Sequence, residues 1–166
     1  MALKEIVLYP DPLLKQVSQE VVDFDAVLEE QLRDLEDTLD AAPGCVGIAA
    51  PQIANLRRIL LIDVSRNRKP VPNQGRLFII NPVIVSSEGA VLGREGCLSL
   101  PHLTANVTRA ERIQVRFQDR FGETKTIDSI EFEARVILHE LDHLDGLLFL
   151  DRVSSLKTDV FRRKRY

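Results

Sequence analysis

The sequence is short of cysteine and has no long apolar run. Its two cysteines cannot build the disulfide framework of a small secreted protein, so we expect free thiols or metal ligands. The longest strongly apolar runs, 59–62 and 77–80, fall far below the roughly 20 residues that cross a bilayer. The sequence therefore predicts no transmembrane helix and no membrane partner.

A secretory signal and a strong net charge are also missing. The first residues, MALKEIVLYPDP, lack the apolar core and small-residue cleavage site of a signal peptide, which favours a cytoplasmic location. The formal net charge of −3 gives no general attraction for nucleic acid, so DNA is not an expected partner. The exception is the basic C-terminal end, which carries Arg162, Arg163, Lys164 and Arg165.

What remains is the composition of an ordinary globular domain. Of the 166 residues, 45% are hydrophobic and 28% are charged, which is enough for a sizeable core and argues against disorder. Repeats and low-complexity segments are absent. We therefore expect one domain that spans residues 1–166.

The spacing of apolar residues predicts three helices. Leucines recur at three- and four-residue steps in the first helix, which Asp23 or Asp25 can cap and which ends before Pro43. A second, mostly apolar helix covers about 132–145, where a glycine follows to stop it. A last short helix is expected around 156–163.

Strand signals lie between the first two helices. Residues 57–64 and 77–85 form short β-branched runs, and Pro82 suggests an edge or a bulge in the second. An alternating pattern on both sides of a turn predicts a hairpin over 113–127, and 70–75 resembles an exposed loop. Strands between unlike helices, without regular alternation, favour an α+β domain with mainly antiparallel sheets.

The second helix contains the motif His139-Glu140-Leu141-Asp142-His143. Its two imidazoles lie four residues apart on one helix face, where both can bind one ion. Glu140 can take a proton from a water whose pKa the ion lowers to about 7 and pass it to a leaving nitrogen, which is amide hydrolysis. A chance match on a helix with surface charges is the alternative. Two of the three histidines of the chain lie in this largely apolar helix. Unpaired buried polar groups are costly, so this placement favours a role as metal ligands.

A third ligand is needed, and the sequence after His143 offers a poor choice. No Glu or His follows, and the position that an extended HExxHxxGxxH motif would use is Phe149. The formally possible downstream donors are Asp145, Asp151 and Asp159, and the upstream donors are Cys45, Cys97 and His102. Cys97 is the best candidate, because Gly96 and Pro101 bracket a tight segment around it. Its thiolate would leave a fourth position for water, whereas a buried, inert thiol is the alternative.

Three blocks of the sequence together resemble the peptide deformylase family. They are Val46–Gln52, Glu95–Pro101 and His139–Gly146, in the order and spacing of the family, and Tyr9–Leu13 adds to them. The resemblance covers most of the chain. It implies an enzyme that removes the N-formyl group from the formylmethionine of newly made polypeptides, and antiparallel sheets packed around a central metal-binding helix.

The resemblance also implies roles for individual residues. The implied metal ligands are Cys97, His139 and His143, and the implied general acid and base is Glu140. Gln52 and the backbone N–H of Leu98 would stabilise the oxyanion that develops when water attacks the formyl carbon. The usual ion of the family is Fe²⁺, and Zn²⁺, Ni²⁺ or Co²⁺ can occupy such a site.

The implied methionine pocket consists of Val46, Gly47, Phe132, Val136 and His139. A structural core explains Phe132 and Val136 equally well. Three positions near this site depart from the family pattern: Cys45 replaces the usual Gly, Leu138 the usual Gln, and Gly93 a larger apolar residue. These departures put the side-chain preference in doubt and remove no catalytic group.

Other residues are implied as support for the ligands. Glu95 and Arg109 match a pair that braces the cysteine segment, and a surface ion pair is the alternative. Asp142 and Asp145 are candidate partners of the histidine ring nitrogens, or else solvated helix charges.

Two rival functions stay open at this point. One is a metallopeptidase that acts on unformylated peptides, and the other is a metal-binding interaction protein without catalysis, against which Gln52 and Glu140 speak. The basic C-terminal end could contact ribosomal RNA where nascent chains emerge, or act only as a solubilising tail.

Overall fold

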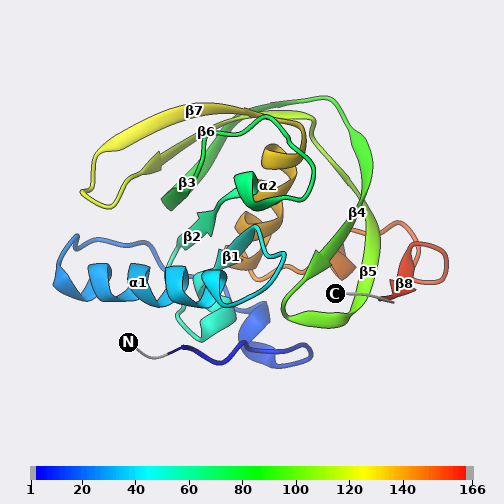
Figure 1. The fold of residues 1–166 in the computed structure, drawn as a ribbon, viewed down its shortest axis with the longest axis horizontal. Helices are drawn as coiled ribbons and strands as arrows, with labels where there is room; N and C mark the ends of the chain where they lie inside the picture. Colours follow the sequence, from blue (N-terminus) through cyan, green and yellow to red (C-terminus); the bar gives the residue numbers. More distant parts are fainter. Residues whose placement is uncertain (1–2, 164–166) are drawn as a thin grey trace.

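The computed structural model describes residues 3–163, which form two antiparallel sheets and two α-helices (Figure 1). One sheet has the strand order β1-β2-β3-β6-β7 and the other has the order β4-β5-β8. The α-helices are α1 (Ala26–Asp40) and α2 (Glu131–Leu144). The strands are β1 (Gly47–Ala49), β2 (Ile59–Ile62), β3 (Leu77–Glu88), β4 (Val91–Cys97), β5 (Leu100–Arg109), β6 (Arg112–Gln118), β7 (Thr124–Ile130) and β8 (Val160–Arg162). The short 3-10 helices are η1 (Pro12–Lys15), η2 (Ala50–Ile53), η3 (Val64–Arg66) and η4 (Phe149–Asp151). The predicted α+β class is confirmed.

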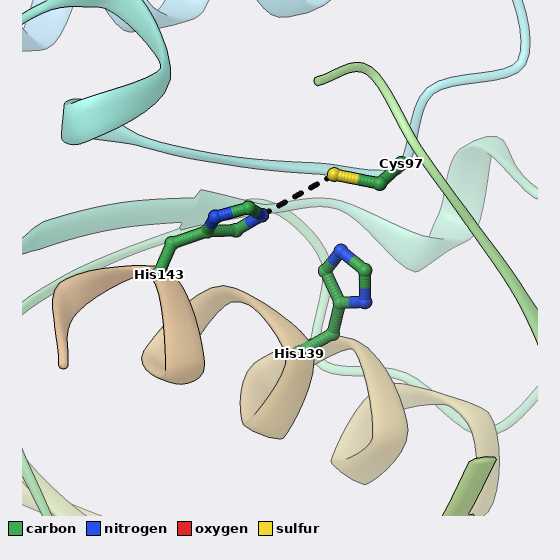
Figure 2. A group of neighbouring side chains, drawn as sticks. All are labelled: Cys97, His139 and His143. Carbon is green, nitrogen blue, oxygen red and sulfur yellow. Dashed lines mark hydrogen bonds between the residues drawn. The ribbon is translucent and has the colours of Figure 1, made fainter. Parts of the chain in front are cut away.

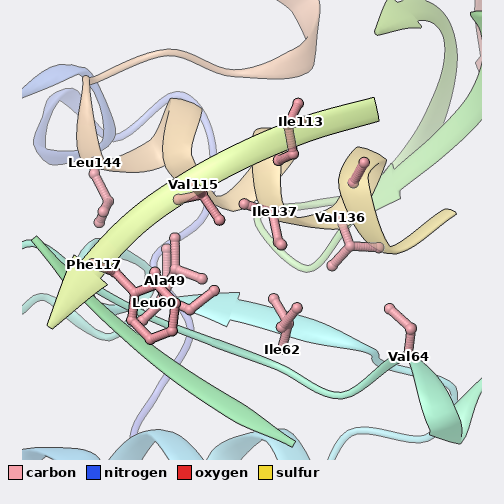
Figure 3. Close-up of a cluster of buried hydrophobic side chains, with 12 residues drawn as sticks. Ala49, Leu60, Ile62, Val64, Ile113, Val115, Phe117, Val136, Ile137 and Leu144 are labelled. Carbon is pink, nitrogen blue, oxygen red and sulfur yellow. The ribbon is translucent and has the colours of Figure 1, made fainter. Parts of the chain in front are cut away.

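The helix α2 lies in the middle of the molecule, and in the view of Figure 1 β6 and β7 pass above it, β1 and β2 lie on one side, and β4 and β5 lie on the other. The four residues of β2 are all buried. Successive side chains of a strand point to opposite faces of the sheet, and here both faces are covered. Leu60 and Ile62 pack against α2, as Figure 3 shows, and Ile59 and Leu61 pack against α1. The five-stranded sheet therefore positions α2 from one face and α1 from the other.

The predicted N-terminal helix is confirmed as α1. The Asp25 carboxylate accepts a hydrogen bond from the backbone N–H of Leu28 at 3.0 Å, so Asp25 and not Asp23 is the N-cap. The leucines that recur in the sequence are fully buried on the inner face: Leu28, Leu32, Leu35 and Leu39. Amphipathic spacing alone thus located this helix.

The predicted bulge in the long strand β3 is also confirmed. The register of β3 against β6 shifts between Ile80 and Val83, on either side of Pro82. At the bulge the Asn81 side chain accepts a hydrogen bond from the N–H of Val21 and donates one to its carbonyl oxygen, at 2.9 and 2.8 Å. The predicted hairpin is present as β6 and β7.

The hairpin of β4 and β5 is longer than the tight segment that the sequence predicted. Glu95 pairs with Ala105 and Gly96 with Thr104, and the register shifts before Cys97 pairs with Leu100. Glycines and charged residues hide the alternating pattern of β4 in the sequence. The irregular register turns the end of β4 toward α2, where Cys97 is buried.

The predicted short helix over 156–163 is wrong. The chain forms the strand β8 there, with Val160 opposite Ala105 and Phe161 opposite Thr104. Valine and phenylalanine fit a pleated strand, and the outer edge of β5 offers backbone groups that a helix would leave unused. The basic residues Lys164 and Arg165 lie outside the described residues.

Within residues 3–163, every helix is too short or too polar to cross a membrane.

Replacing Asp25 with Ala tests the cap of α1. Loss of the hydrogen bond to the Leu28 N–H should lower the free energy of unfolding by about 1 kcal/mol, measured by urea denaturation. Asp23→Ala is the matched control, because this exposed residue should change stability by less than about 0.5 kcal/mol. Equal losses in the two variants would contradict the cap assignment.

Candidate metal centre and active-site pocket

A sulfur and two imidazole rings converge in the interior. Cys97 is the last residue of β4, and His139 and His143 lie one turn apart on α2 (Figure 2). One ligand atom from each residue lies within 4.8 Å of the others, and Cys97 Sγ is 3.3 Å from His143 Nε2. The other upstream donors, Cys45 and His102, lie outside this group. The convergence predicted from the sequence is therefore present.

These residues fit a divalent ion. A thiolate with two imidazoles leaves the fourth position of a tetrahedral site open. Beside them, Glu140 Oε1 is buried without a hydrogen-bond partner and lies 4.0 Å from His143 Nε2. A buried carboxylate oxygen is costly unless something binds it. A metal ion with its bound solvent would supply a partner for this oxygen.

Glu95 connects the cluster to buried arginines. Its Oε1 atom lies 2.8 Å from His139 Nδ1, which leaves Nε2 of that ring for a metal. Arg109 donates two hydrogen bonds of 2.9 Å to Glu95, and Arg135 donates a third of 2.7 Å. Because Glu95 and Arg109 are both 6% exposed, they do not form a surface ion pair. The carboxylate thus joins β4, β5 and α2.

Neither Asp142 nor Asp145 contacts a histidine ring. Asp142 is buried and accepts hydrogen bonds from Arg109 at 2.6 Å and from Arg152 at 2.8 Å. Asp145 is exposed and pairs with Arg58 at 2.8 Å. The hypothesis that one of them supports a ring is therefore wrong. Asp142 instead holds Arg109, which in turn holds Glu95.

Burial and neighbouring charges shift the pKa values of the site. Burial alone would raise the pKa of Glu95, but hydrogen bonds from Arg109 and His139 outweigh it and hold that pKa well below its usual range. Burial raises the pKa of Glu140 to about 7. Burial, His139 and Arg109 together lower the pKa of His143, which favours the neutral form that binds a metal, whereas Glu140, Cys97 and Glu95 outweigh burial and raise the pKa of His139.

Gln52 reaches the cluster from η2. Its amide nitrogen lies 3.1 Å from Ser99 Oγ and 3.5 Å from Cys97 Sγ, and its oxygen accepts a 3.0 Å hydrogen bond from the N–H of Ala49. These contacts point the donor end toward the sulfur. Leu98 follows Cys97 in the turn between β4 and β5 and lines the same pocket. Ser99 has no motif of its own in the sequence, so its contact with Gln52 appears only in the structure.

The cluster opens into a pocket with a volume of about 220 Å³. The predicted pocket residues that line it are Val46, Gly47, Phe132, Val136 and His139, beside Gln52, Glu95, Cys97, Leu98 and Glu140. Three arginines that no sequence pattern places at the pocket also line it: Arg94, Arg135 and, from the basic C-terminal end, Arg163. Only spatial proximity distinguishes them from the many other charged residues of the chain.

Two glycines leave space that the site needs. A Cβ atom at Gly47 would lie 2.8 Å from Glu140 Oε2 and 2.8 Å from a methyl group of Val136. A Cβ atom at Gly93 would lie 2.8 Å from the guanidinium carbon of Arg135. The departure at position 93 therefore has a physical reason: it admits the arginine that binds Glu95.

The other two departures are also accommodated. The Cys45 thiol donates a hydrogen bond of 3.1 Å to the carbonyl oxygen of Gly47, and burial raises its pKa to about 12. Such a thiol is unreactive, and both cysteines are free. Leu138 packs against the core that surrounds α2.

A cysteine sulfur, two imidazoles and a buried carboxylate gathered beside one pocket are the groups that metal-dependent hydrolases use. Comparison with known proteins agrees, since residues 3–159 match the family model described as polypeptide deformylase. A peptide deformylase of Helicobacter pylori is 41% identical over 164 residues, which cover 99% of this chain and 94% of that protein. One from Thermodesulfovibrio yellowstonii is 40% identical and covers 99% and 97%.

Solved structures give the same result. The crystal structure of a peptide deformylase from Legionella pneumophila has a TM-score of 0.85 and 39% identity, covering 94% of this chain and 89% of that one. The peptide deformylase from Thermotoga maritima has a TM-score of 0.85 and 32% identity, covering 93% and 100%. The chain belongs to the peptide deformylase family.

Replacing Glu95 with Gln tests its support of His139. Glutamine keeps one acceptor oxygen but no negative charge, so it cannot satisfy the His139 ring, Arg109 and Arg135 together, and metal affinity should fall by about 10- to 100-fold. Competition with a chelator measures this affinity, and thermal unfolding of the metal-free variant checks the fold. Glu88→Gln, at an exposed position, should match the wild type. Unchanged affinity in Glu95→Gln would show that this carboxylate does not support the metal ligands.

Proposed function

We propose that the protein removes the formyl group from the N-terminal formylmethionine of newly made polypeptides and releases formate. The observation that carries this proposal is the convergence of Cys97, His139 and His143 beside Glu140, next to a pocket, in a chain that belongs to the peptide deformylase family. The two rivals, a peptidase of unformylated peptides and an inactive metal-binding protein, gain no support from the comparisons.

Cys97, His139 and His143 would hold one divalent ion. When bound, the ion supplies a positive charge that polarises the formyl oxygen and lowers the pKa of water to about 7. We infer Fe²⁺ as the ion in the cell, on the resemblance to the family, and the same donors suit Zn²⁺, Ni²⁺ or Co²⁺. Glu95 and Arg109 would act as positioning residues, since they fix the His139 ring.

Glu140 would move the proton. Its unpartnered Oε1 atom takes a proton from the water that attacks the formyl carbon. The carbon–nitrogen bond then breaks, and the same carboxyl group gives the proton to the departing amine. This transfer gives formic acid and a free amine, and at neutral pH the acid loses its proton and the amine takes one up, so the products are formate and a peptide with a free N-terminal methionine.

Gln52 and Leu98 would stabilise the charge that develops on the formyl oxygen. The amide nitrogen of Gln52 is held beside Cys97 by Ser99, and the backbone N–H of Leu98 directly follows the sulfur ligand. Two fixed donors in a buried site stabilise an oxyanion without reorganisation. The methionine side chain would occupy the pocket beside Val46, Gly47, Phe132 and Val136.

The cellular setting follows from the substrate. We infer a cytoplasmic protein, because newly made polypeptides are its substrates. We also infer that residues 1–166 act as one catalytic domain. Contact with the ribosome through the basic C-terminal end would bring the enzyme close to them, and the alternative is a tail that only aids solubility. Arg162 and Arg163 are the described part of that end.

Replacing Glu140 with Gln should lower kcat by at least about 100-fold while metal content stays stoichiometric, because the amide cannot accept a proton. Turnover of a formylated peptide and elemental analysis measure the two quantities. Glu131→Gln, an exposed change in the first turn of α2, is the matched control and should keep wild-type turnover. Full activity in metal-loaded Glu140→Gln would overturn the assigned role.

A comparison of three peptides tests the reaction itself. Formyl-Met-Ala-Ser should be turned over at least about tenfold faster than acetyl-Met-Ala-Ser, since one additional methyl group is discriminated by about 10- to 200-fold in a fitted pocket. Met-Ala-Ser should stay intact. Mass spectrometry distinguishes loss of the formyl group from cleavage between amino acids, and the latter would favour the metallopeptidase.

A further inference from the structure

Two arginines line the active-site pocket and take no part in the chemistry described above. Arg94 lies exposed on β4, and Arg163 directly follows β8. We propose that Arg94, assisted by Arg163, selects formylated peptides that carry an acidic side chain within the two residues after methionine. This inference rests on the proposed deformylase function and adds a charge preference to it.

The Arg94 guanidinium is held in place at the pocket wall. Its Nε atom donates a 3.0 Å hydrogen bond to Asn106 Oδ1, and Nη1 donates one of 3.3 Å to Thr104 Oγ1. Its central carbon lies 3.8 Å from the centroid of the Phe161 ring on β8. A cation that is already ordered loses less conformational entropy when it binds a carboxylate.

The charge of Arg94 is not compensated by a neighbour. No ion pair among residues 3–163 includes Arg94, whereas Arg109 and Arg135 both pair with Glu95. Its hydrogen-bond partners on β5 are a neutral amide and a neutral hydroxyl. The carboxylates that line the pocket, Glu95 and Glu140, are both buried. The exposed part of the pocket wall at β4 is therefore positive.

Arg163 adds a second cation at the same wall. Its backbone N–H donates a 2.8 Å hydrogen bond to the carbonyl oxygen of His102, which continues the β8 contact with β5. A Cβ atom at Gly96 would lie 2.7 Å from Nη1 of Arg163, so the missing side chain lets the guanidinium approach the backbone of β4. Arg94 and the space left by Gly96 thus place two cations beside the same segment of β4.

A bound peptide would pass this segment as it leaves the pocket. With its formyl group beside Glu140 and its methionine in the pocket, the following residues extend outward by about 3.3 Å each. Their side chains then lie within reach of long arginine side chains at the rim. Opposite charges attract there and like charges repel, which affects the encounter and the affinity for the transition state.

The test compares formyl-Met-Ala-Glu-amide with formyl-Met-Ala-Lys-amide, and the same pair with the charged residue directly after methionine. The C-terminal amides remove a confounding carboxylate. For at least one pair, the ratio of kcat/KM should favour Glu by roughly fivefold at low salt and approach one at high salt. In Arg94→Glu the ratio should invert. Each ratio compares two peptides with the same enzyme preparation, so a lower fraction of active enzyme changes both values equally and leaves the ratio unchanged.

Arg162→Glu is the matched control, because it makes the same charge change at an exposed residue of β8 that does not line the pocket. It should keep the wild-type ratio, and Arg163→Gln should reduce the ratio. Turnover with a ratio of one, or an equal ratio in wild type and Arg94→Glu, overturns the charge preference alone. An absence of turnover with every formylated peptide overturns the proposed function and this inference together.

Discussion

The buried charge of Glu95 is the constraint on which the site depends. This carboxylate is the acceptor for the His139 ring and for two arginines, and it joins three elements that are distant in sequence. A buried carboxylate is stable only when its charge is compensated and its oxygens are hydrogen-bonded. The arginines meet both conditions, and Asp142 accepts a hydrogen bond from one of them, Arg109. The ring orientation therefore follows from an electrostatic requirement of the interior.

The fold supplies the rigid frame for this arrangement. Apolar side chains fix α2 against the five-stranded sheet, and the irregular end of β4 brings Cys97 to the same helix. Ligands on a helix and on a strand are held more precisely than ligands on loops. Gly47 also contributes, because a Cβ atom at this position would lie 2.8 Å from the Glu140 carboxylate and displace it.

Local patterns in the sequence predicted the features that depend on neighbouring residues. Leucine spacing located α1, and the interval between His139 and His143 placed two rings on one face. Cys97 emerged because the chain offers few other donors. The strand β8 was mistaken for a helix, since the edge of β5 that it pairs with is distant in sequence. Arg135 went unnoticed for the same reason: its partners lie on β4 and β5.

The close approach of Gly93 and Arg135 has an evolutionary consequence. A Cβ atom at position 93 would lie 2.8 Å from the guanidinium carbon of Arg135, so a side chain there would require this buried guanidinium to move. A lineage that acquires a bulky apolar residue at 93 would displace or lose Arg135, and Glu95 would then depend on Arg109 alone for compensation of its charge. The residues at positions 93 and 135 are therefore expected to change together among relatives of this chain.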